Sequence, residues 1–209
     1  MDILITGASR GLGAAVAREF GKRYTENLYL TSRNEKALKE LKKGIEKEFK
    51  GVHVHSFPHD LANPQEIDEL VNEIKMYTGN IDILINNAGA LVKGDFGKTE
   101  FTEIERVFRV NYFAPALLVR KLIPMLKKSD IAHVLSISSM AGYQGSVKFP
   151  GLAHYGASKA ALSTMSEILA VEYQKEKISF NSLAIGSVQT EMLEEAFPGV
   201  KAPLTPSEM

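Results

Sequence analysis

The feature of this sequence that most constrains its fold is a regular alternation of short apolar runs with longer amphipathic stretches. The short runs are rich in Ile, Leu and Val, and several are nearly continuous in these residues, as is typical of strands covered on both faces. The longer stretches repeat their apolar residues with the period of a helix. We therefore predict strands at Asp2–Thr6, Asn27–Thr31, Val52–Phe57, Ile81–Asn86, His133–Ile137 and Ile178–Ala184, and helices at Gly11–Lys22, Asn34–Phe49, Pro64–Tyr77, Thr99–Leu126 and Ala153–Lys175.

Strict alternation of strand and helix predicts an α/β fold, because parallel strands are joined by crossover helices that pack on the faces of the sheet. We expect a single-domain, Rossmann-like doubly wound parallel sheet with strand order 3-2-1-4-5-6 and helices on both faces. The chain of 209 residues is long enough for one substantial core and shows no linker, so residues 1–209 are treated as one domain. Pro115 and Pro124 should bend or end the long fourth helix.

The composition argues against several classes of function. Twenty-five basic and twenty-five acidic residues cancel, which disfavours a nucleic-acid or an anionic-membrane partner. Without cysteine there is no disulfide, thiolate nucleophile or zinc–thiolate site, and His53 and His55 have no carboxylate cluster beside them that would complete a metal site. No apolar run is long enough to cross a bilayer and no signal peptide precedes the first strand, so we expect a cytoplasmic location and no membrane contact.

A glycine-rich loop directly follows the first predicted strand and opens the first helix. Gly7 allows a tight turn, Gly11 lets the backbone approach a pyrophosphate, and Gly13 lets the helix pack closely on the sheet. The free N–H groups and the positive dipole end of the helix would then bind the phosphates. The alternative is a glycine-rich turn that binds nothing. We expect the phosphates of a dinucleotide to lie against Gly7, Ser9, Arg10, Gly11, Leu12 and Gly13.

The end of the second predicted strand indicates which nicotinamide cofactor is bound. Proteins that prefer NAD usually carry an acidic residue there, which holds the ribose 2′-hydroxyl. Here the sequence has Ser32 and Arg33, and the first acid is Glu35. Arg33 and Arg10 can neutralise a 2′-phosphate, with Ser32 donating a hydrogen bond. This pattern favours NADP(H) over NAD(H), although both arginines would also suit a solvated surface.

A tyrosine and a lysine one helical turn apart form the candidate catalytic pair. Tyr155 and Lys159 share a helix face, and a nearby ammonium group lowers the pKa of a phenol below its ordinary value of about 10. Such a pair can give a proton to a carbonyl or take one from an alcohol. The spacing is weak evidence by itself, because Tyr173 and Lys177 repeat it in an ion-rich segment.

The segment after the fifth predicted strand supplies a candidate hydroxyl group beside the first pair. Ligands of open α/β sheets bind beyond the carboxyl ends of the strands, and Ser139 lies there. Its hydroxyl can donate to the oxygen that becomes negative during hydride transfer. Ser138 is equally compatible with an inward-facing strand residue that bonds to the backbone.

Four motifs, in their order along the chain, resemble the signature set of the short-chain dehydrogenase/reductase family: Thr6–Gly13, Asn86–Gly89, Ser139 and Tyr155-x3-Lys159. The resemblance extends from residue 6 to about residue 192. It implies that Tyr155 is the general acid/base, that Lys159 lowers its pKa and holds the nicotinamide ribose, and that Ser139 steadies the substrate carbonyl. It also implies that Asn111 kinks the fourth long helix and anchors a proton-relay water.

The resemblance also assigns residues to the cofactor. The pair after strand three would flank the adenine, the segment after strand four would pass beside the adenosine ribose, and the segment after strand six would contact the carboxamide. One departure from the family pattern is Ile185, which stands where proline usually precedes the glycine. The residues assigned in this way are Asp60, Leu61, Asn87, Ala88, Gly89, Gly186, Val188 and Thr190, together with Tyr155 and Lys159.

The activity implied by the resemblance is hydride transfer between NADP(H) and a small carbonyl or alcohol substrate, in a homodimer or homotetramer. The alternative is a non-catalytic dinucleotide-binding protein of the same fold, with a regulatory or signalling role. The segment from Glu191 to Pro203 is a candidate lid. An apolar substrate wall is expected from Met140, Tyr143, Phe149 and Met192.

Two features near the end of the chain depart from the family pattern. The family's final strand is absent, which puts its usual tetramer interface in question. Thr205–Glu208 has the residues of a helix start, with proline at the first helical position and an acid at the third, one residue before the chain stops. We therefore expect either a fragment or a protein that has lost a final helix and strand.

Overall fold

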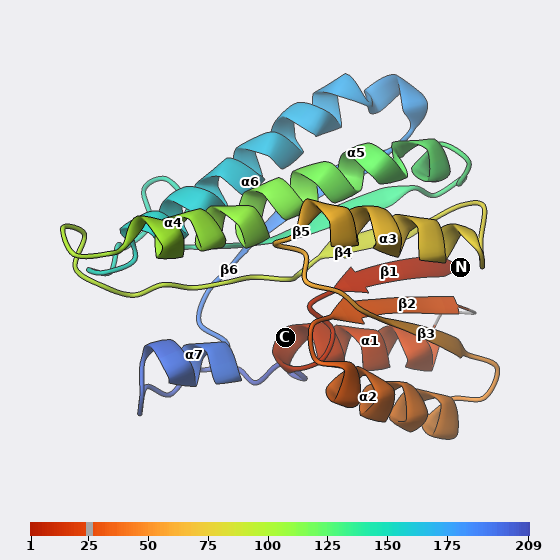
Figure 1. Cartoon of the computed structure of the whole chain (residues 1–209), viewed down its shortest axis with the longest axis horizontal. Coiled ribbons are helices and arrows are strands. Elements are labelled where there is room, and N and C mark those ends of the chain that lie inside the picture. The colour runs from red at the N-terminus through yellow and green to blue at the C-terminus, as the bar shows by residue number, and fades with distance from the viewer. Residues whose placement is uncertain (24–26) are drawn as a thin grey trace.

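The computed structural model describes residues 1–23 and 27–209, which form a parallel sheet with helices on both faces (Figure 1). The strand order β3-β2-β1-β4-β5-β6 confirms the predicted doubly wound α/β fold. All neighbouring strands are parallel, and in the centre of the sheet Leu4 lies between Tyr29 and Leu84. The strands are β1 (Asp2–Thr6), β2 (Asn27–Ser32), β3 (His53–Pro58), β4 (Ile83–Asn86), β5 (His133–Ser139) and β6 (Ser179–Ile185).

Helices α1 and α2 cover one face of the sheet, and α3, α5 and α6 cover the other (Figure 1). Successive residues of β1 serve the two faces in turn: Ile3 and Ile5 belong to the core under α1 and α2, and Leu4 belongs to the opposite core. This double covering explains the nearly continuous apolar runs. The helices are α1 (Gly11–Arg23), α2 (Glu35–Glu48), α3 (Pro64–Lys75), α4 (Phe101–Phe108), α5 (Ala114–Leu126), α6 (Ala153–Glu172) and α7 (Glu191–Ala196).

Asparagine caps fix the starts of two helices close to the carboxyl edge of the sheet. The Asn34 side chain accepts a hydrogen bond from the N–H of Ala37 at 3.1 Å, at the start of α2. The Asn63 side chain accepts one from Gln65 at 3.1 Å, and Pro64 is the first residue of α3. Each cap contributes about 1 kcal/mol. These caps hold the segments after β2 and β3 in place.

The helix predicted over Thr99–Leu126 is divided into three parts. Between α4 and α5 lies a π-helical turn, η1 (Arg109–Phe113), which buries Asn111 completely. Pro115 lies in the first turn of α5, directly after η1. Pro124 lies inside α5, which ends two residues later at Leu126. The interruption therefore precedes Pro115, and Pro124 comes just before the end of the helix.

The segment after β6 contains a helix that was predicted only as a candidate lid. Thr190 caps α7 by accepting a hydrogen bond from the N–H of Leu193 at 3.3 Å. Val188 forms an isolated parallel bridge with Leu204. The predicted helix start at Thr205–Glu208 is a turn, in which the Glu208 carboxylate accepts from the Thr205 N–H at 2.8 Å as in a capping box. Among residues 27–209, β6 is the last strand.

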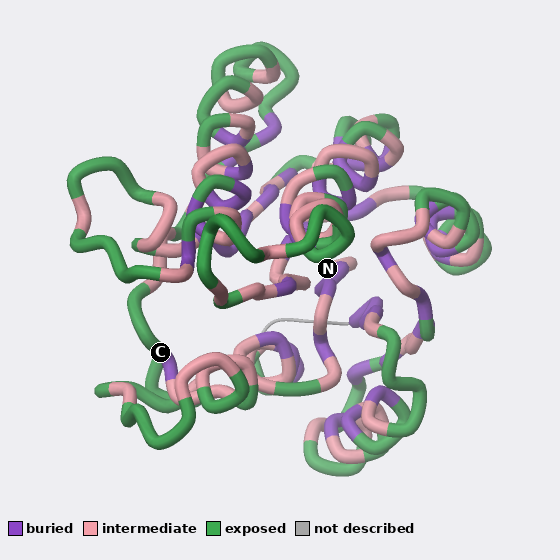
Figure 2. The backbone as a smooth tube through the Cα atoms, turned by 60° about the vertical axis from the view of Figure 1, so that its left-hand side comes forward, coloured by how far each residue is buried: buried purple, intermediate pink, exposed green. Residues whose placement is uncertain are grey.

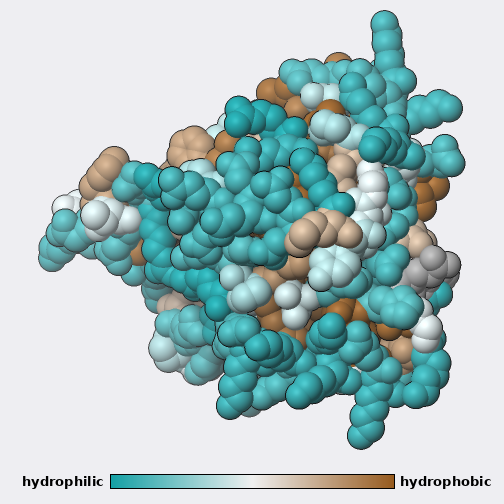
Figure 3. Space-filling model, turned by 45° about the vertical axis from the view of Figure 1, so that its right-hand side comes forward, coloured by the Kyte–Doolittle hydropathy of each residue, from teal (hydrophilic) through white to brown (hydrophobic). Residues whose placement is uncertain are grey.

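Burial is highest along the strands and lowest in the connecting loops (Figure 2). The face of the molecule in Figure 3 is mostly hydrophilic, with apolar side chains in small separate areas. Within the described part of the chain, no helix has the length and apolar character needed to span a membrane.

Candidate active site

The segments that follow all six strands line one cavity of about 1110 Å³. Parallel strands point the same way, so their carboxyl ends meet at one edge of the sheet. Gly13 and Asn111 lie behind the cavity wall. The other residues that the sequence assigned to catalysis or cofactor binding all line the cavity: Gly7, Ser9, Arg10, Gly11, Leu12, Ser32, Arg33, Asp60, Leu61, Asn87, Ala88, Gly89, Ser139, Tyr155, Lys159, Gly186, Val188 and Thr190.

The glycine loop is held against the end of β4 by a small hydrogen-bond network. The Thr6 hydroxyl accepts from the N–H groups of Asn87 (3.0 Å) and Ala88 (2.9 Å). The Asn87 side-chain amide donates to the Thr6 carbonyl at 2.9 Å. Gly7 and Gly11 have φ values of 65° and 54°, and a Cβ atom on Gly7 would stand 2.7 Å from Ala88 Cα. Glycine is therefore required at Gly7 by both conformation and space.

The first turn of α1 faces this cavity with free backbone donors. The N–H of Ala14 is the first to bond back, to the Arg10 carbonyl at 3.3 Å, so the N–H groups of the first turn have no partner within the helix. Helix α1 has no acidic residue in its first turn that would offset the positive dipole end. Gly13 packs directly on the Gly7 carbonyl, where a Cβ atom would overlap. The loop and the helix start thus fit an anionic group such as a pyrophosphate.

The segments after β2 and β3, which the sequence assigned to the adenosine part of a cofactor, line one end of the cavity. The Ser32 hydroxyl accepts from the Asn34 N–H at 3.2 Å, so its own proton can be donated. Arg33 is exposed and forms no ion pair with the residues that the structure describes. Leu61 is buried, and the Asp60 carboxylate turns back to accept from a backbone N–H within its own loop. Leu61 can therefore pack on an adenine.

His59 was not predicted and lies immediately before this loop. Its ring is buried and lines the cavity, with Nε2 3.3 Å from a Glu73 oxygen. Glu66 and Glu69 of the same helix lie 3.8 and 4.0 Å from Nδ1. The spacing of the three glutamates on one face of α3 was the signal in the sequence that could have revealed this contact.

Arg10, predicted as a ligand of the 2′-phosphate, is paired with a carboxylate from the far end of the chain. Its Nη1 lies 2.6 Å from Glu195 Oε1, and its Nη2 lies 3.4 Å from Oε2. The hydrogen bond and charge of Glu195, together with the charge of Glu191, raise the pKa of Arg10. The two side chains are 49% and 62% exposed. Pairs this exposed contribute about 0–1 kcal/mol.

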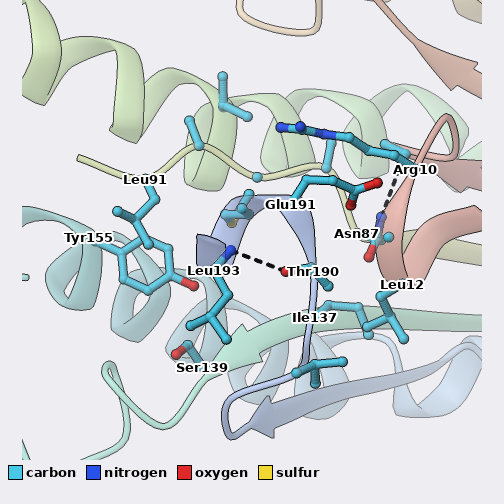
Figure 4. Close-up of a pocket in the computed structure, with 18 of the residues that line it drawn as sticks. Arg10, Leu12, Asn87, Leu91, Ile137, Ser139, Tyr155, Thr190, Glu191 and Leu193 are labelled. Carbon is cyan, nitrogen blue, oxygen red and sulfur yellow. Dashed lines mark hydrogen bonds between the residues drawn. The ribbon is translucent and has the colours of Figure 1, made fainter. Parts of the chain in front are cut away.

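At the other end of the cavity, Tyr155 and Ser139 project into the same space (Figure 4). Gly156 brings the start of α6 against the end of β5, since a Cβ atom there would stand 2.8 Å from the Ala141 carbonyl. The pKa of Tyr155 is raised, mainly because burial penalises the phenolate, and the Ser139 hydroxyl lowers it in part. The phenol therefore holds its proton at neutral pH.

Lys159 is buried one turn farther along α6. Its ammonium group donates to the Ile137 carbonyl at 2.8 Å, and burial lowers its pKa to about 8. The Ser138 hydroxyl donates to the Lys159 carbonyl at 2.8 Å, so Ser138 ties β5 to α6 and faces inward. The sequence predicted that Lys159 lowers the pKa of Tyr155. In the structure the shift comes from burial and from Ser139. The effect of Lys159 on this pKa stays a prediction.

Asn111 connects the π turn to the catalytic helix. Its Oδ1 accepts from the Ala90 N–H, and its Nδ2 donates to the Ala90 carbonyl, each at 2.8 Å. Nδ2 also donates to the Ser158 hydroxyl at 2.9 Å, which in turn donates to the Tyr155 carbonyl at 2.7 Å. Both N–H groups of this amide are used, and its oxygen accepts one hydrogen bond. The side chain itself positions the backbone of Tyr155.

Apolar side chains surround the catalytic end of the cavity. Of the predicted substrate wall, Met140, Phe149 and Met192 line the cavity, whereas Tyr143 is 59% exposed and does not. Arg106 and Val110 also line it, and their i, i+4 spacing directly before Asn111 was a usable signal. Six further lining residues come from loops or from the candidate lid, and which of them face the cavity depends on tertiary folding: Ala90, Leu91, Leu152, Leu193, Phe197 and Val200.

The remaining histidines do not line the cavity. His53 is exposed on the edge strand β3, and His55 stacks on Tyr29 with ring centroids 5.1 Å apart. His154 stacks on Phe96 at 5.1 Å and is not on the cavity wall. Within residues 1–23 and 27–209, no group of three or more His, Asp or Glu is arranged to hold a metal ion.

The shape and donors of the cavity fit a nicotinamide dinucleotide. It extends from Ser32 and Arg33, past the free N–H groups of α1, to Tyr155. Gly186 lines the same wall, and a Cβ atom on it would meet nothing within 4 Å, so the backbone of this segment is accessible to a ligand. A dinucleotide needs this order of groups: polar residues for one ribose, phosphate donors in the middle and the reactive side chain at the far end.

Comparison with known proteins identifies the class. The family model for short chain dehydrogenase matches residues 2–201, so the chain belongs to the short-chain dehydrogenase family of oxidoreductases. It is 34% identical over 192 residues to a fatty acyl-CoA reductase of Acinetobacter baylyi. The matched region covers 91% of this chain and 63% of the relative. It is 33% identical to dehydrogenase/reductase SDR family member 7B of Xenopus tropicalis, over 94% of this chain and 64% of the relative. The chain thus spans less than two thirds of these curated relatives.

A solved structure gives the same result for the fold. The short-chain dehydrogenase of Sphingobium yanoikuyae in complex with NADPH superposes with a TM-score of 0.88 at 30% identity. The match covers 99% of this chain and 80% of the other.

Proposed function

We propose that this chain is an NADP(H)-dependent oxidoreductase that transfers a hydride to a small carbonyl substrate, or from the matching alcohol. The observation that supports this most is that Ser139, Tyr155 and Lys159 line the same cavity as the glycine loop. Residues 1–209 would act as one cofactor-binding catalytic domain. A homodimer or homotetramer in the cytoplasm belongs to the same proposal.

In the reductive direction, the Tyr155 hydroxyl donates its proton to the carbonyl oxygen of the substrate. Its raised pKa suits this task, because the phenol is protonated throughout the neutral range. The Ser139 hydroxyl donates a hydrogen bond to the same oxygen as negative charge develops on it. NADPH, when bound, supplies the hydride.

Lys159 holds its charge behind Tyr155 and stabilises the phenolate that remains after proton donation. With a pKa of about 8, the ammonium group is present at neutral pH and is lost as the pH rises further. Asn111 acts through Ser158 on the backbone of Tyr155 and is therefore a positioning residue. A proton-relay water at the main chain of the π turn would reload Tyr155.

Arg33, Ser32 and Arg10 would hold the 2′-phosphate, and the absence of an acid at the end of β2 favours NADP(H) over NAD(H). The apolar wall around Tyr155 suits a carbonyl that carries an aliphatic or aromatic substituent. The Acinetobacter relative is named for reduction of a fatty acyl-CoA. Apolar aldehydes and ketones are therefore the substrates to test first.

The test is to follow nicotinamide absorbance with NADPH, and separately with NADH, against a panel of aldehydes and ketones of increasing apolar size. We expect oxidation of NADPH that depends on substrate and is faster than that of NADH. Faster turnover with NADH would contradict the role of Arg10 and Arg33. Binding of NADPH without turnover of any carbonyl would instead support the non-catalytic dinucleotide-binding protein.

A further inference from the structure

Helix α7 lies across the cavity between its two ends. In Figure 4, Tyr155 is at one side, Arg10 is at the other, and Leu193 of α7 stands between them. Leu193 lines the cavity together with Thr190, which caps the helix. Any ligand that reaches from the 2′-phosphate end to Tyr155 must therefore pass beside α7.

One side-chain contact holds α7 at each end of the cavity. At the cofactor end, Glu195 pairs with Arg10 through both of its oxygens, at 2.6 and 3.4 Å. At the substrate end, Lys93 lies over the ring of Phe197, directly after α7, with Nζ 4.1 Å from the ring centroid. The first contact is ionic and joins residues 185 positions apart in the sequence.

The acidic side chains of α7 occupy the positive features that a phosphate ligand would use. Glu191 reaches the glycine loop, where its Oε2 stands 3.4 Å from the position of a Cβ atom on Gly11. Both Glu191 and Glu195 act on the charge of Arg10. The first turn of α1 has no acid of its own, so α7 provides the negative charge at this site.

We propose that Glu195 lowers the preference for NADP(H) over NAD(H) by competing with the 2′-phosphate of NADP(H) for Arg10. This inference rests on the proposed function, which assigns Arg10 to that phosphate. A phosphate monoester carries up to two negative charges and three acceptor oxygens, and a carboxylate carries one charge and two oxygens. The 2′-phosphate therefore displaces Glu195 from Arg10. The binding free energy of NADP(H) is reduced by the free energy that the ion pair had contributed.

NADH and NADPH should differ in what they do to α7. NADH has no 2′-phosphate, so it leaves Arg10 paired with Glu195. NADPH removes that contact and leaves α7 held at the Lys93–Phe197 end, next to the substrate. Glu195 thus reduces the preference for NADPH that Arg10 and Arg33 create.

The experiment measures binding rather than turnover. The wild-type protein and Glu195→Gln are titrated with NADPH and with NADH, and the nicotinamide fluorescence is followed. Since an exposed ion pair contributes little, Glu195→Gln should lower the Kd for NADPH by about two- to five-fold. The Kd for NADH should stay the same. A substitution that merely loosens α7 would move both constants together.

The matched control is Glu194→Gln, which removes the same charge from the same helix. The Glu194 carboxylate accepts from the Gly199 N–H at 3.0 Å and does not touch Arg10, so this variant should leave the ratio of the two constants unchanged. In an Arg10→Gln background, Glu195→Gln should have no effect on NADPH binding.

Three results would overturn the inference: unchanged or weaker NADPH binding by Glu195→Gln, an equal shift for both cofactors, or an effect that persists without Arg10. The first, found in a protein that turns over with NADPH, would leave the proposed function intact. Binding without turnover by the wild type would remove only the catalytic part of the proposed function. If the wild type binds neither cofactor, both proposals fall.

Discussion

Two tyrosine–lysine pairs with the same spacing lie at opposite ends of helix α6, and they differ in almost every other respect. Lys159 is 5% exposed, and Tyr155 faces the cavity. Lys177 is exposed and has a left-handed backbone with φ of 57°. Tyr173 packs its ring against Phe180, with centroids 5.7 Å apart. Burial and a ligand cavity therefore separate the two pairs, and the spacing does not.

The difference follows from the direction of the strands. Helix α6 begins beside Ser139, the last residue of β5, and ends near the beginning of β6. The carboxyl ends of the strands open into the cavity, whereas near the amino end of β6 the ring of Phe180 packs against Tyr173. A tyrosine–lysine pair at the carboxyl edge of the sheet can therefore reach a ligand, whereas a pair at the amino edge contributes to packing.

Tyr155→Phe tests the comparison with the largest expected effect. Removal of the phenolic proton should lower kcat for carbonyl reduction by about 10³- to 10⁴-fold. Tyr173→Phe should stay within about two-fold of the wild type, because Tyr173 does not line the cavity and the lost hydroxyl group is distant from the chemistry. Both are measured by steady-state oxidation of NADPH. Equal losses in the two variants would break the distinction between the pairs.

Lys159→Met should lower kcat by about 10²- to 10³-fold, since the phenolate left by proton donation would lose the adjacent positive charge. Lys177→Met, a matched loss of charge at the exposed pair, should leave kcat unchanged. The reductive rate of the wild type should also fall as the pH rises through about 8, where Lys159 loses its proton. Lys159→Met should lack that limb of the pH–rate profile.

Lys159→Met should also stabilise the folded protein. Burial lowers the pKa of Lys159 from 10.5 to about 8, so keeping the protonated amine folded costs about 3 kcal/mol. Loss of the hydrogen bond to Ile137 offsets about 1 kcal/mol, which leaves a gain of roughly 2 kcal/mol. The unfolded chain binds the extra proton between pH 8 and 10.5, so the cost is full below pH 8 and disappears as the pH approaches 10.5. Urea unfolding of Lys159→Met and the wild type at pH 7 and pH 10.5 measures it.

Much of this contrast could be predicted because it depends on strand order. Period and turn residues defined the six strands, and their order placed Gly7, Ser139 and Tyr155 at one edge. The helices predicted from Asn34 and from Pro64 begin within one residue of those positions, because the asparagine caps that fix their starts are local contacts. Local patterns and parallel topology were sufficient for these features.

The parts that could not be predicted depend on contacts between distant segments. Arg10 forms an ion pair with Glu195, and no sequence pattern near either residue predicts this pair. The resemblance implied a kink of the fourth long helix at Asn111, but the π turn there and the bonds from Asn111 to Ala90 had no signal in the sequence. Loop positions around the substrate, such as the exposed Tyr143, likewise follow from tertiary packing.

Ser139→Ala tests what the hydroxyl group beside Tyr155 contributes to the first pair. Ser139 both lowers the pKa of Tyr155 and would bond to the substrate oxygen, so its loss should reduce kcat by about 10²-fold. Alcohol oxidation needs the phenolate, so its pH optimum should move upward in this variant. Ser138→Ala is the control within the same strand, because the Ser138 hydroxyl bonds to the Lys159 carbonyl. It should lower stability by about 1 kcal/mol and leave the pH profile unchanged.

Lys177→Gly gives the smallest expected effect and concerns the second pair alone. Lys177 follows the short 3-10 turn Gln174–Glu176 with a φ of 57°, a conformation that disfavours a side chain and suits glycine at the end of a helix. Glycine should relieve about 1 kcal/mol of backbone strain, partly offset by the greater freedom of the unfolded chain, for a net gain of about 0.5 kcal/mol. Thermal unfolding should show a Tm higher by about 1–2 °C with kcat unchanged. Lys175→Gly, in the same turn but without a positive φ, should instead destabilise the folded protein. A loss of activity in Lys177→Gly would mean that the second pair contributes to catalysis.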